Sequence, residues 1–293
     1  ADRFGDYVNG FREFPGYPDL PERPARVEEV TVFLAAMQRE RFDLIVQLHG
    51  SGVVTNPLAA LLGGCRVASF YIPGQYCPDA ELFLPWPERG PEVRRLLQLM
   101  DFLGVPPQGE ELEFPLCMQE YQDLAAIEGT DDLQPSNYGC IYPEVSVPQR
   151  RWAVGGFAAV ARALASQGFC GVLTATATEA PLTRAVASKL DAPPLDLAGR
   201  TGLGALATLL KGARLLVCND TGVSHMAAAL RVPRVVLSTG SNPERWAPLD
   251  RQRHRVLRQE SLNRFEEVLA QVEDVLGASV GTQGREPCSH CVS

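Results

Sequence analysis

The sequence predicts an α/β protein whose second half is a doubly wound parallel sheet. From Gly139 onwards, short apolar runs alternate with segments of helical spacing, which is typical of parallel strands joined by crossover helices. Two predicted strands, 42–48 and 215–217, end in polar turns that contain glycine and lead into a helix. The 293 residues are enough for two domains, each with its own core.

Composition and charge narrow the class of protein. Hydrophobic residues make up 45% of the chain and charged residues 21%, as in ordinary globular proteins. The 27 Lys and Arg against 35 Asp and Glu give a net charge of −8, which argues against a nucleic-acid binder. No apolar run approaches the roughly 20 residues that span a bilayer, and no signal peptide is visible. We therefore expect a cytoplasmic protein without a transmembrane segment. Because the chain begins with Ala1, we leave open that it is a processed or partial chain.

Most of the eight cysteines lie in apolar runs, which predicts buried free thiols rather than a disulfide framework. Cys288 and Cys291 form a CxxC pair with His290 between them. A complete zinc site needs four ligands, so this pair is half of one. We expect two loose thiols and no metal site, and leave metal binding by this pair open.

The first part of the chain is predicted to alternate helices and strands, with helices over 27–39, 57–62 and 91–103, strands over 42–48 and 66–71, and a further candidate strand over 110–116. The strand 42–48 runs into the turn HGSG, which contains His49 and Ser51. Such a turn suits an anion or a hydroxylated ligand. A plain loop between strand and helix is the alternative.

The second part has the clearer alternation, with strands over 140–142, 171–174, 195–197, 215–217 and 235–237 and helices over 157–166, 180–190, 203–211, 223–230 and 265–276. The polar segment 128–138 is typical of a linker. We therefore expect a first domain over residues 1–135, a second over 138–258, and a terminal helix and tail over 259–293. Ligands of such sheets bind beyond the carboxyl ends of the strands.

The turn after strand 215–217 is the strongest candidate site. Thr221, Gly222 and Val223 open a helix there, and its first amides and its dipole attract anions, phosphate above all. Gly222 lets the backbone come close to a ligand. The carboxylate of Asp220 suits sugar hydroxyls, and His225 suits either group. The alternatives are that Asp220 or Thr221 only caps the helix and that His225 is structural.

Three charged side chains lie near other predicted strand ends. Arg150 and Arg151 precede a helix and would add to phosphate binding, unless both are simply solvated. Glu179 follows the strand 171–174, where a carboxylate could accept hydrogen bonds from the two hydroxyls of a ribose. Alternatively, it is a helix N-terminal glutamate favoured by the dipole.

A GxGxxA pattern at Gly202, Gly204 and Ala207 imitates a dinucleotide fingerprint, with Asp220 further on. Four residues separate the preceding strand from the first glycine, whereas the fingerprint glycine ends its strand. We therefore discount an NAD-dependent oxidoreductase, which rests on this pattern alone.

Four segments resemble glycosyltransferase family nine, the ADP-heptose:lipopolysaccharide heptosyltransferases: CNDTGVSHMAAAL (218–230), QRRW (149–152), DLAGRTGLGALATLL (196–210) and FDLIVQLHGS (42–51). The resemblance covers most of the chain. It implies a GT-B fold, in which two Rossmann-like domains enclose a cleft. The donor ADP-heptose would lie on the second domain, and the first domain, with His49 and Ser51, would face the acceptor.

The resemblance also implies roles for single residues. The amides of 221–223 would bind the diphosphate, and Asp220 and His225 would contact the sugar–diphosphate region. Arg150 would offset the charge of the leaving group, so that Asp220 and Arg150 are the catalytic candidates. Glu179 would hold the adenosine ribose.

The chain departs from the family pattern at several positions. Tyr142, Pro143 and Glu144 stand where a His-Pro-Gly turn is usual, and Ala175 stands where a glycine is usual. Both changes could tighten or alter the nucleotide pocket. The family begins with a strand and a turn that carries an aspartate, the presumed base, and nothing similar precedes Phe42. We therefore expect a truncated first domain and cannot assign the base.

Together these features predict an inverting, metal-independent glycosyltransferase without a cofactor. Its donor would be an ADP-sugar, and its acceptor a lipopolysaccharide core or a similar glycolipid or glycan, met by peripheral association with the inner membrane. The alternative from another class is a non-catalytic relative that only binds a nucleotide sugar.

Overall fold

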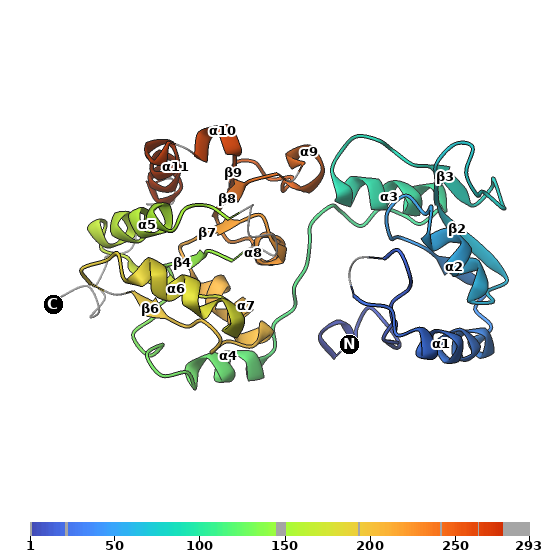
Figure 1. Cartoon of the computed structure of the whole chain (residues 1–293), viewed down its shortest axis with the longest axis horizontal. Coiled ribbons are helices and arrows are strands. Elements are labelled where there is room, and N and C mark those ends of the chain that lie inside the picture. Colours follow the sequence, from blue (N-terminus) through green and yellow to red (C-terminus); the bar gives the residue numbers. More distant parts are fainter. Residues whose placement is uncertain are drawn as a thin grey trace. The chain divides into compact units, whose positions relative to one another are not determined.

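The computed structural model describes residues 2–20, 23–144, 151–192, 194–240, 242–262 and 264–277. The chain divides into two compact units, Ala1–Glu110 and Glu111–Ser293 (Figure 1). This division falls earlier than the boundary near residue 135 that the polar segment suggested. The reason is that helix α4 (Met118–Ala125), which lies before that segment, packs against α7 (Leu203–Gly212) of the second unit.

The first unit contains a parallel three-stranded sheet in the order β1-β2-β3, made of Leu44–Val46, Arg66–Tyr71 and Phe83–Pro85. Its helices are η1 (Asp2–Phe4), α1 (Val27–Glu40), α2 (Thr55–Leu61) and α3 (Glu92–Phe102). The predicted helices and the strand 66–71 are therefore confirmed. Residues 110–116 form no strand, so that prediction was wrong.

The second unit is built on a parallel sheet of six strands in the order β6-β5-β4-β7-β8-β9. The strands are β4 (Tyr138–Tyr142), β5 (Cys170–Leu173), β6 (Leu195–Asp196), β7 (Leu215–Asn219), β8 (Arg234–Ser238) and β9 (His254–Arg258). Counted from the first, this order is 3-2-1-4-5-6, that of the Rossmann fold. The predicted doubly wound sheet is confirmed, and β9 extends the five predicted strands to six.

Helices cover both faces of this sheet, namely α5 (Val154–Ser166), η3 (Ala177–Glu179), α6 (Ala180–Ala187), α7, α8 (Gly222–Ala229), α9 (Pro243–Trp246), α10 (Gln259–Leu262) and α11 (Phe265–Gly277). Because successive strand residues point to opposite faces, Val217 and Val235 pack with α5 and α11, whereas Cys218 packs with α7 and α8.

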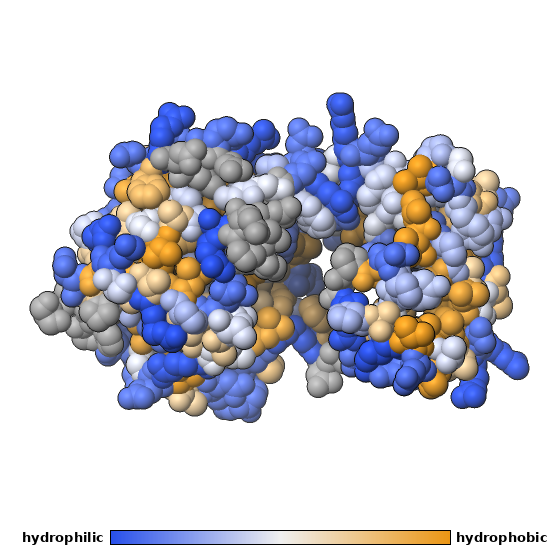
Figure 2. All heavy atoms as spheres, viewed as in Figure 1, coloured by the Kyte–Doolittle hydropathy of each residue, from blue (hydrophilic) through white to orange (hydrophobic). Residues whose placement is uncertain are grey.

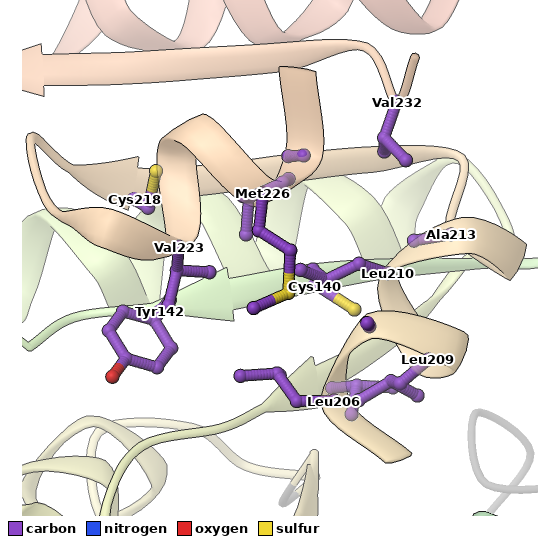
Figure 3. Close-up of a cluster of buried hydrophobic side chains, with 14 of the residues drawn as sticks. Cys140, Tyr142, Leu206, Leu209, Leu210, Ala213, Cys218, Val223, Met226 and Val232 are labelled. Atoms are coloured by element: carbon purple, nitrogen blue, oxygen red, sulfur yellow. The ribbon is translucent and has the colours of Figure 1, made fainter. Parts of the chain in front are cut away.

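The face covered by α7 and α8 holds a dense apolar cluster (Figure 3). Met226 extends from α8 towards Cys140 on β4, and the hydroxyl of Tyr142 points out of the cluster. This packing fixes α8 on the sheet and so holds the turn between β7 and α8 in place.

Three of the six described cysteines, Cys140, Cys170 and Cys218, are buried free thiols, as predicted. Cys65 and Cys117 are exposed. Cys288 and Cys291 lie outside the described residues. Over the described ranges, no three His, Cys, Asp or Glu side chains are grouped as a metal site would require.

Candidate functional site

The carboxyl ends of β4 and β7 meet at the centre of the six-stranded sheet. There the order of the strands reverses, because β4 leads towards β5 on one side and β7 leads towards β8 on the other. Ligands of open parallel sheets bind beyond the strand ends at this topological switch point. The predicted turn at Asp220–Gly222 follows β7 and therefore lies at this position.

Asn219 ties the loops of the switch point together. Its fully buried amide donates from Nδ2 to the carbonyl of Pro143 at 2.7 Å, and its Oδ1 accepts from the backbone amide of Trp152 at 3.3 Å. One side chain thus joins the end of β7 to the loop after β4 and to the chain that enters α5. Sequence reasoning did not assign Asn219 a role, since its partners are more than 60 residues away along the chain.

The turn between β7 and α8 leaves polar groups available to a ligand. Thr221 is the N-cap of α8, but its hydroxyl makes no capping bond, and its buried Oγ1 has no hydrogen-bond partner in the part of the chain that the structure describes. Among the described residues, no donor is found for the half-buried carboxylate of Asp220. The alternative in which either oxygen is used up on the helix amides is therefore not what the structure has. A Cβ built on Gly222 meets nothing within 4 Å, so open space lies beside it.

His225 lies in the first turn of the same helix, next to Trp246, with the ring centroids 6.1 Å apart in an edge-on arrangement. Burial lowers the pKa of His225 from 6.5, the nearby charge of Arg234 lowers it further, and Asp220 opposes both effects. The imidazole is therefore neutral at pH 7. It can donate one hydrogen bond and accept another, but it adds no positive charge to the turn.

Asp220 also borders a small cavity of about 10 Å³, which is about the space of one water molecule. Its other lining residues come from α8, β8, β9 and the α9 segment: Ser224, Val236, Ser238, Pro243, Trp246, Ala247, Pro248 and Val256.

The structure brings two of the predicted donor-site residues into direct contact. Arg151 donates from Nη2 to Glu179 Oε2 at 3.1 Å, and both side chains are about a quarter exposed. Glu179 is the N-cap residue of α6 but makes no capping bond with its side chain. The carboxylate is therefore engaged by an arginine rather than by the helix amides. Arg150 lies outside the described residues.

Glu144, which stands where the family pattern has a glycine, links two loops by hydrogen bonds. Glu144 Oε2 accepts a hydrogen bond from the hydroxyl of Tyr142 at 2.6 Å and another from the amide of Thr176 at 3.1 Å. Burial, with Glu144 beside it, raises the pKa of Tyr142 well above its usual range, so the hydroxyl stays protonated and donates. This carboxylate ties the loop after β4 to the loop after β5.

The GxGxxA pattern serves helix packing. Gly202 is the N-cap of α7, which follows the edge strand β6 and is thus remote from the switch point. A Cβ on Gly204 would collide with the side chain of Glu120 on α4. The glycine lets the two helices approach, which removes the basis for a dinucleotide fingerprint.

The first unit has a pocket of its own, with a volume of about 570 Å³. Its lining is mainly apolar and includes Phe11, Phe14, Phe33, Ile45, Leu58 and the predicted acceptor-side residue His49. Ser51 does not line it. Figure 2 shows apolar residues among hydrophilic ones on the visible face of this unit. The turn after β1 leads into a helix of only seven residues, whose dipole would attract an anion weakly. Because the pocket lining is mainly apolar, it suits an apolar group better than the anion considered from the sequence.

Buried amides support the turn that carries His49. Gln47 Nε2 donates to Asn56 Oδ1 at 2.8 Å and to Ser69 Oγ at 2.9 Å, and Asn56 Nδ2 donates to the carbonyl of Phe70 at 2.7 Å. This network joins β1, α2 and β2 and fixes the loop in place.

None of the helices in the described ranges is both long and apolar enough to cross a membrane.

Comparisons with known proteins agree with this architecture. A curated relative, lipopolysaccharide heptosyltransferase 2 of Salmonella typhimurium, is 33% identical over 180 residues, which are 57% of this chain and 50% of the relative. The chain spans at most half the length of the curated relatives that it matches.

Two solved structures share the fold. One is a family 9 glycosyl transferase from Veillonella parvula, with a TM-score of 0.71, 20% identity, and coverage of 88% of this chain and 81% of that chain. The other is ADP-heptose LPS heptosyltransferase II of E. coli, with a TM-score of 0.68, 19% identity, and coverage of 88% and 84%. The α/β fold with parallel sheets is thus that of GT-B heptosyltransferase structures.

The family model described as glycosyltransferase family 9 (heptosyltransferase) matches residues 85–271, which include β4, β7, α8 and the whole switch point. This match extends over more than half of the chain. The chain therefore belongs to glycosyltransferase family 9, the heptosyltransferase family.

Proposed function

We propose that the protein is a glycosyltransferase that moves a heptose-type sugar from an ADP-sugar to a lipopolysaccharide core or a similar acceptor, with inversion at the anomeric carbon. The observation that carries the proposal is the turn at Asp220–Gly222. At the switch point it combines open space beside helix amides with a carboxylate that accepts no hydrogen bond from the described residues. The structural neighbour from E. coli is an ADP-heptose heptosyltransferase, which supports the choice of donor.

In this proposal the amides of residues 221–223 bind the diphosphate, aided by the dipole of α8. Asp220 accepts hydrogen bonds from sugar hydroxyls, and the neutral His225 bonds to the sugar or to the bridging phosphate oxygen. Glu179, held by Arg151, accepts from the ribose.

The reaction needs the enzyme to stabilise a leaving group. The acceptor oxygen attacks the anomeric carbon, the bond from that carbon to the diphosphate oxygen breaks, and its electron pair leaves with ADP. Negative charge grows on the diphosphate, where the helix amides and Arg150 would stabilise it. The acceptor proton passes to a base that we do not assign. No metal or cofactor takes part in this scheme.

The acceptor would meet the first unit, where His49 borders the apolar pocket. A lipid-linked acceptor would supply the apolar group that this lining suits. We place the protein in the cytoplasm, with peripheral association with the inner membrane.

Calorimetry with ADP and with ADP-heptose tests the donor site. Micromolar binding of both is expected in the natural sequence. Asp220→Ala should remove the extra affinity for the sugar, at least about tenfold, which is the size of a charged hydrogen bond. Arg150→Ala should weaken both ligands. Asp123→Ala, on an exposed position of α4, is the matched control and should change neither. Absence of ADP binding in the folded protein would refute the donor site.

A non-catalytic nucleotide-sugar binder is the second candidate, because no base is assigned. Release of ADP in the presence of a lipopolysaccharide-core acceptor separates the two. Tight ADP-heptose binding without acceptor-dependent release would favour the binder.

A further inference from the structure

Arg234 is a charged side chain in the core of the second unit. It is the first residue of β8 and is fully buried. Alternation along the strand puts it on the same face as Val236 and Ser238, the face covered by α8. Its register partners are Leu216 on β7 and His254 on β9.

Several buried polar atoms in this part of the second unit lack a hydrogen-bond partner among the described residues. Nε, Nη1 and Nη2 of Arg234 have no hydrogen-bond partner, and neither do Nδ1 of His254 and Oγ1 of Thr221. Buried polar atoms in native proteins are almost always paired. A buried charge without a partner opposes folding because its lost hydration is not replaced. A guanidinium retained at such a site is therefore better explained by a ligand than by the fold.

The electrostatics connect Arg234 to the candidate site. Burial lowers the pKa of Arg234 to about 10, while Cys218 and Asp220 act to raise it, so the guanidinium is charged at pH 7. Its charge in turn lowers the pKa of His225 and of His254, after the larger effect of burial on each. The geometry agrees, because Val236 and Ser238, which share the strand face of Arg234, border the same small cavity as Asp220 at the start of α8.

We propose that Arg234 is a positioning residue for the donor, a buried cation on the sheet face that α8 covers, which raises the affinity of the turn at Asp220–Gly222 for a diphosphate and does not stabilise the fold. This inference rests on the proposed function in one respect, which is that the complete ligand is an ADP-sugar. Its own ligand class is the diphosphate group, which inorganic pyrophosphate supplies without nucleoside or sugar.

The test measures pyrophosphate affinity and thermal unfolding in the same set of full-length variants. Arg234→Met removes the charge from the core, and Arg234→Gln does so with a polar side chain. The matched control is Arg255→Met on the neighbouring strand β9, which loses the same charge from a partly exposed arginine paired with Asp274 at 2.9 Å.

Arg234→Met is expected to bind pyrophosphate about tenfold more weakly, the size of one charged interaction. Its melting temperature should stay the same or rise, since the variant removes a buried charge that no described group hydrogen-bonds. Arg255→Met should bind as the natural sequence does. A purely structural arginine would instead lower the melting temperature.

Equal pyrophosphate affinity in folded Arg234→Met, or no pyrophosphate binding by the natural sequence, would overturn the inference. So would failure of both neutral variants to fold. If pyrophosphate binds through Arg234 but ADP binds no more tightly than pyrophosphate, the inference stands and the nucleotide-sugar function fails.

Discussion

At the scale of single residues, His254 makes the second unit sensitive to acid. Burial and then the charge of Arg234 lower its pKa from 6.5 to about 4. As the pH falls below 6.5, the unfolded chain takes up a proton at this position and the folded chain does not until about pH 4. The free energy of unfolding should therefore fall between pH 6.5 and pH 4, by up to about 3 kcal/mol.

Urea unfolding at pH 4.5 and pH 7.5 measures this loss, and His254→Gln should reduce the difference between the two pH values. The lowered pKa of His225 acts in the same direction, so some difference should remain. An unchanged difference in His254→Gln would show that His254 is not the group that titrates.

Asn219→Ala tests the tie across the switch point. The change removes the two buried hydrogen bonds that Asn219 makes with the carbonyl of Pro143 and the amide of Trp152. Unsatisfied buried groups cost about 1–3 kcal/mol each, so the loss of two bonds should lower the unfolding free energy by about 2–6 kcal/mol. Asn137→Ala removes two bonds of 3.0 and 3.3 Å in an exposed turn, where water can replace them, and should lose less than about 1 kcal/mol. Equal losses in the two variants would contradict the role of Asn219.

Local sequence patterns predicted Asp220, Thr221, Gly222 and His225 as neighbours of one turn, because strand, turn and helix follow one another within about ten residues. Asn219 and Arg234 were not predicted as parts of the site. Their environment depends on which strands lie side by side, and the pairing of β8 with β7 and β9 is not written in any local pattern.

At the scale of elements, Gly204 decides how closely α4 and α7 pack. Gly→Ala inside a helix normally gains about 1 kcal/mol. At Gly204 the new methyl would meet the Glu120 side chain, which is buried and already accepts from the amide of Cys117 at 2.9 Å. Gly204→Ala should therefore lose about 1 kcal/mol or more of unfolding free energy.

Gly155→Ala is the control for this substitution. Gly155 lies in α5, and the nearest atom to an added Cβ is 4.0 Å away on Phe265. It should gain up to about 1 kcal/mol. Chemical unfolding of both variants gives the comparison, and a gain at Gly204 equal to that at Gly155 would mean that the helices are not in tight contact.

Elements with a strong apolar period were predicted well, among them α1, β2, α7 and α11. Helix α4 was missed because its sequence, MQEYQDLA, is mostly polar. It is held by packing against α7, which a local pattern does not reveal. Strand β9 was missed since HRVLR carries three basic residues. The alternation in 110–116 imitated a strand, but no neighbouring strand pairs with it.

At the scale of the whole molecule, the second unit contains a complete sheet with an apolar core on each face. A chain cut to residues 111–293 is therefore expected to fold alone and to unfold cooperatively. It should bind ADP within about threefold of the full chain, since every described residue of the proposed donor site lies in this unit. Calorimetry and thermal unfolding of the shortened chain measure both. Loss of cooperative unfolding would show that the first unit is needed for the second to fold.

The doubly wound architecture followed from alternation alone, because only parallel strands with crossover helices repeat in that way. The division between the units did not follow, since composition identified the polar segment 128–138 but not the packing of α4 that precedes it.

The buried cysteines allow the rate of local unfolding at α8 to be measured by thiol labelling. Cys140 and Cys218 lie in the core beneath α8, and burial raises the pKa of Cys218 to about 12 and that of Cys140 further. A thiol reagent at pH 8 should label the exposed Cys65 and Cys117 within minutes. Cys140 and Cys218 should react only after local unfolding exposes their thiols, and therefore more slowly. The lag between the two labelling phases, read by mass spectrometry, would then report how often α8 lifts from the sheet, and a ligand bound at its first turn should lengthen that lag.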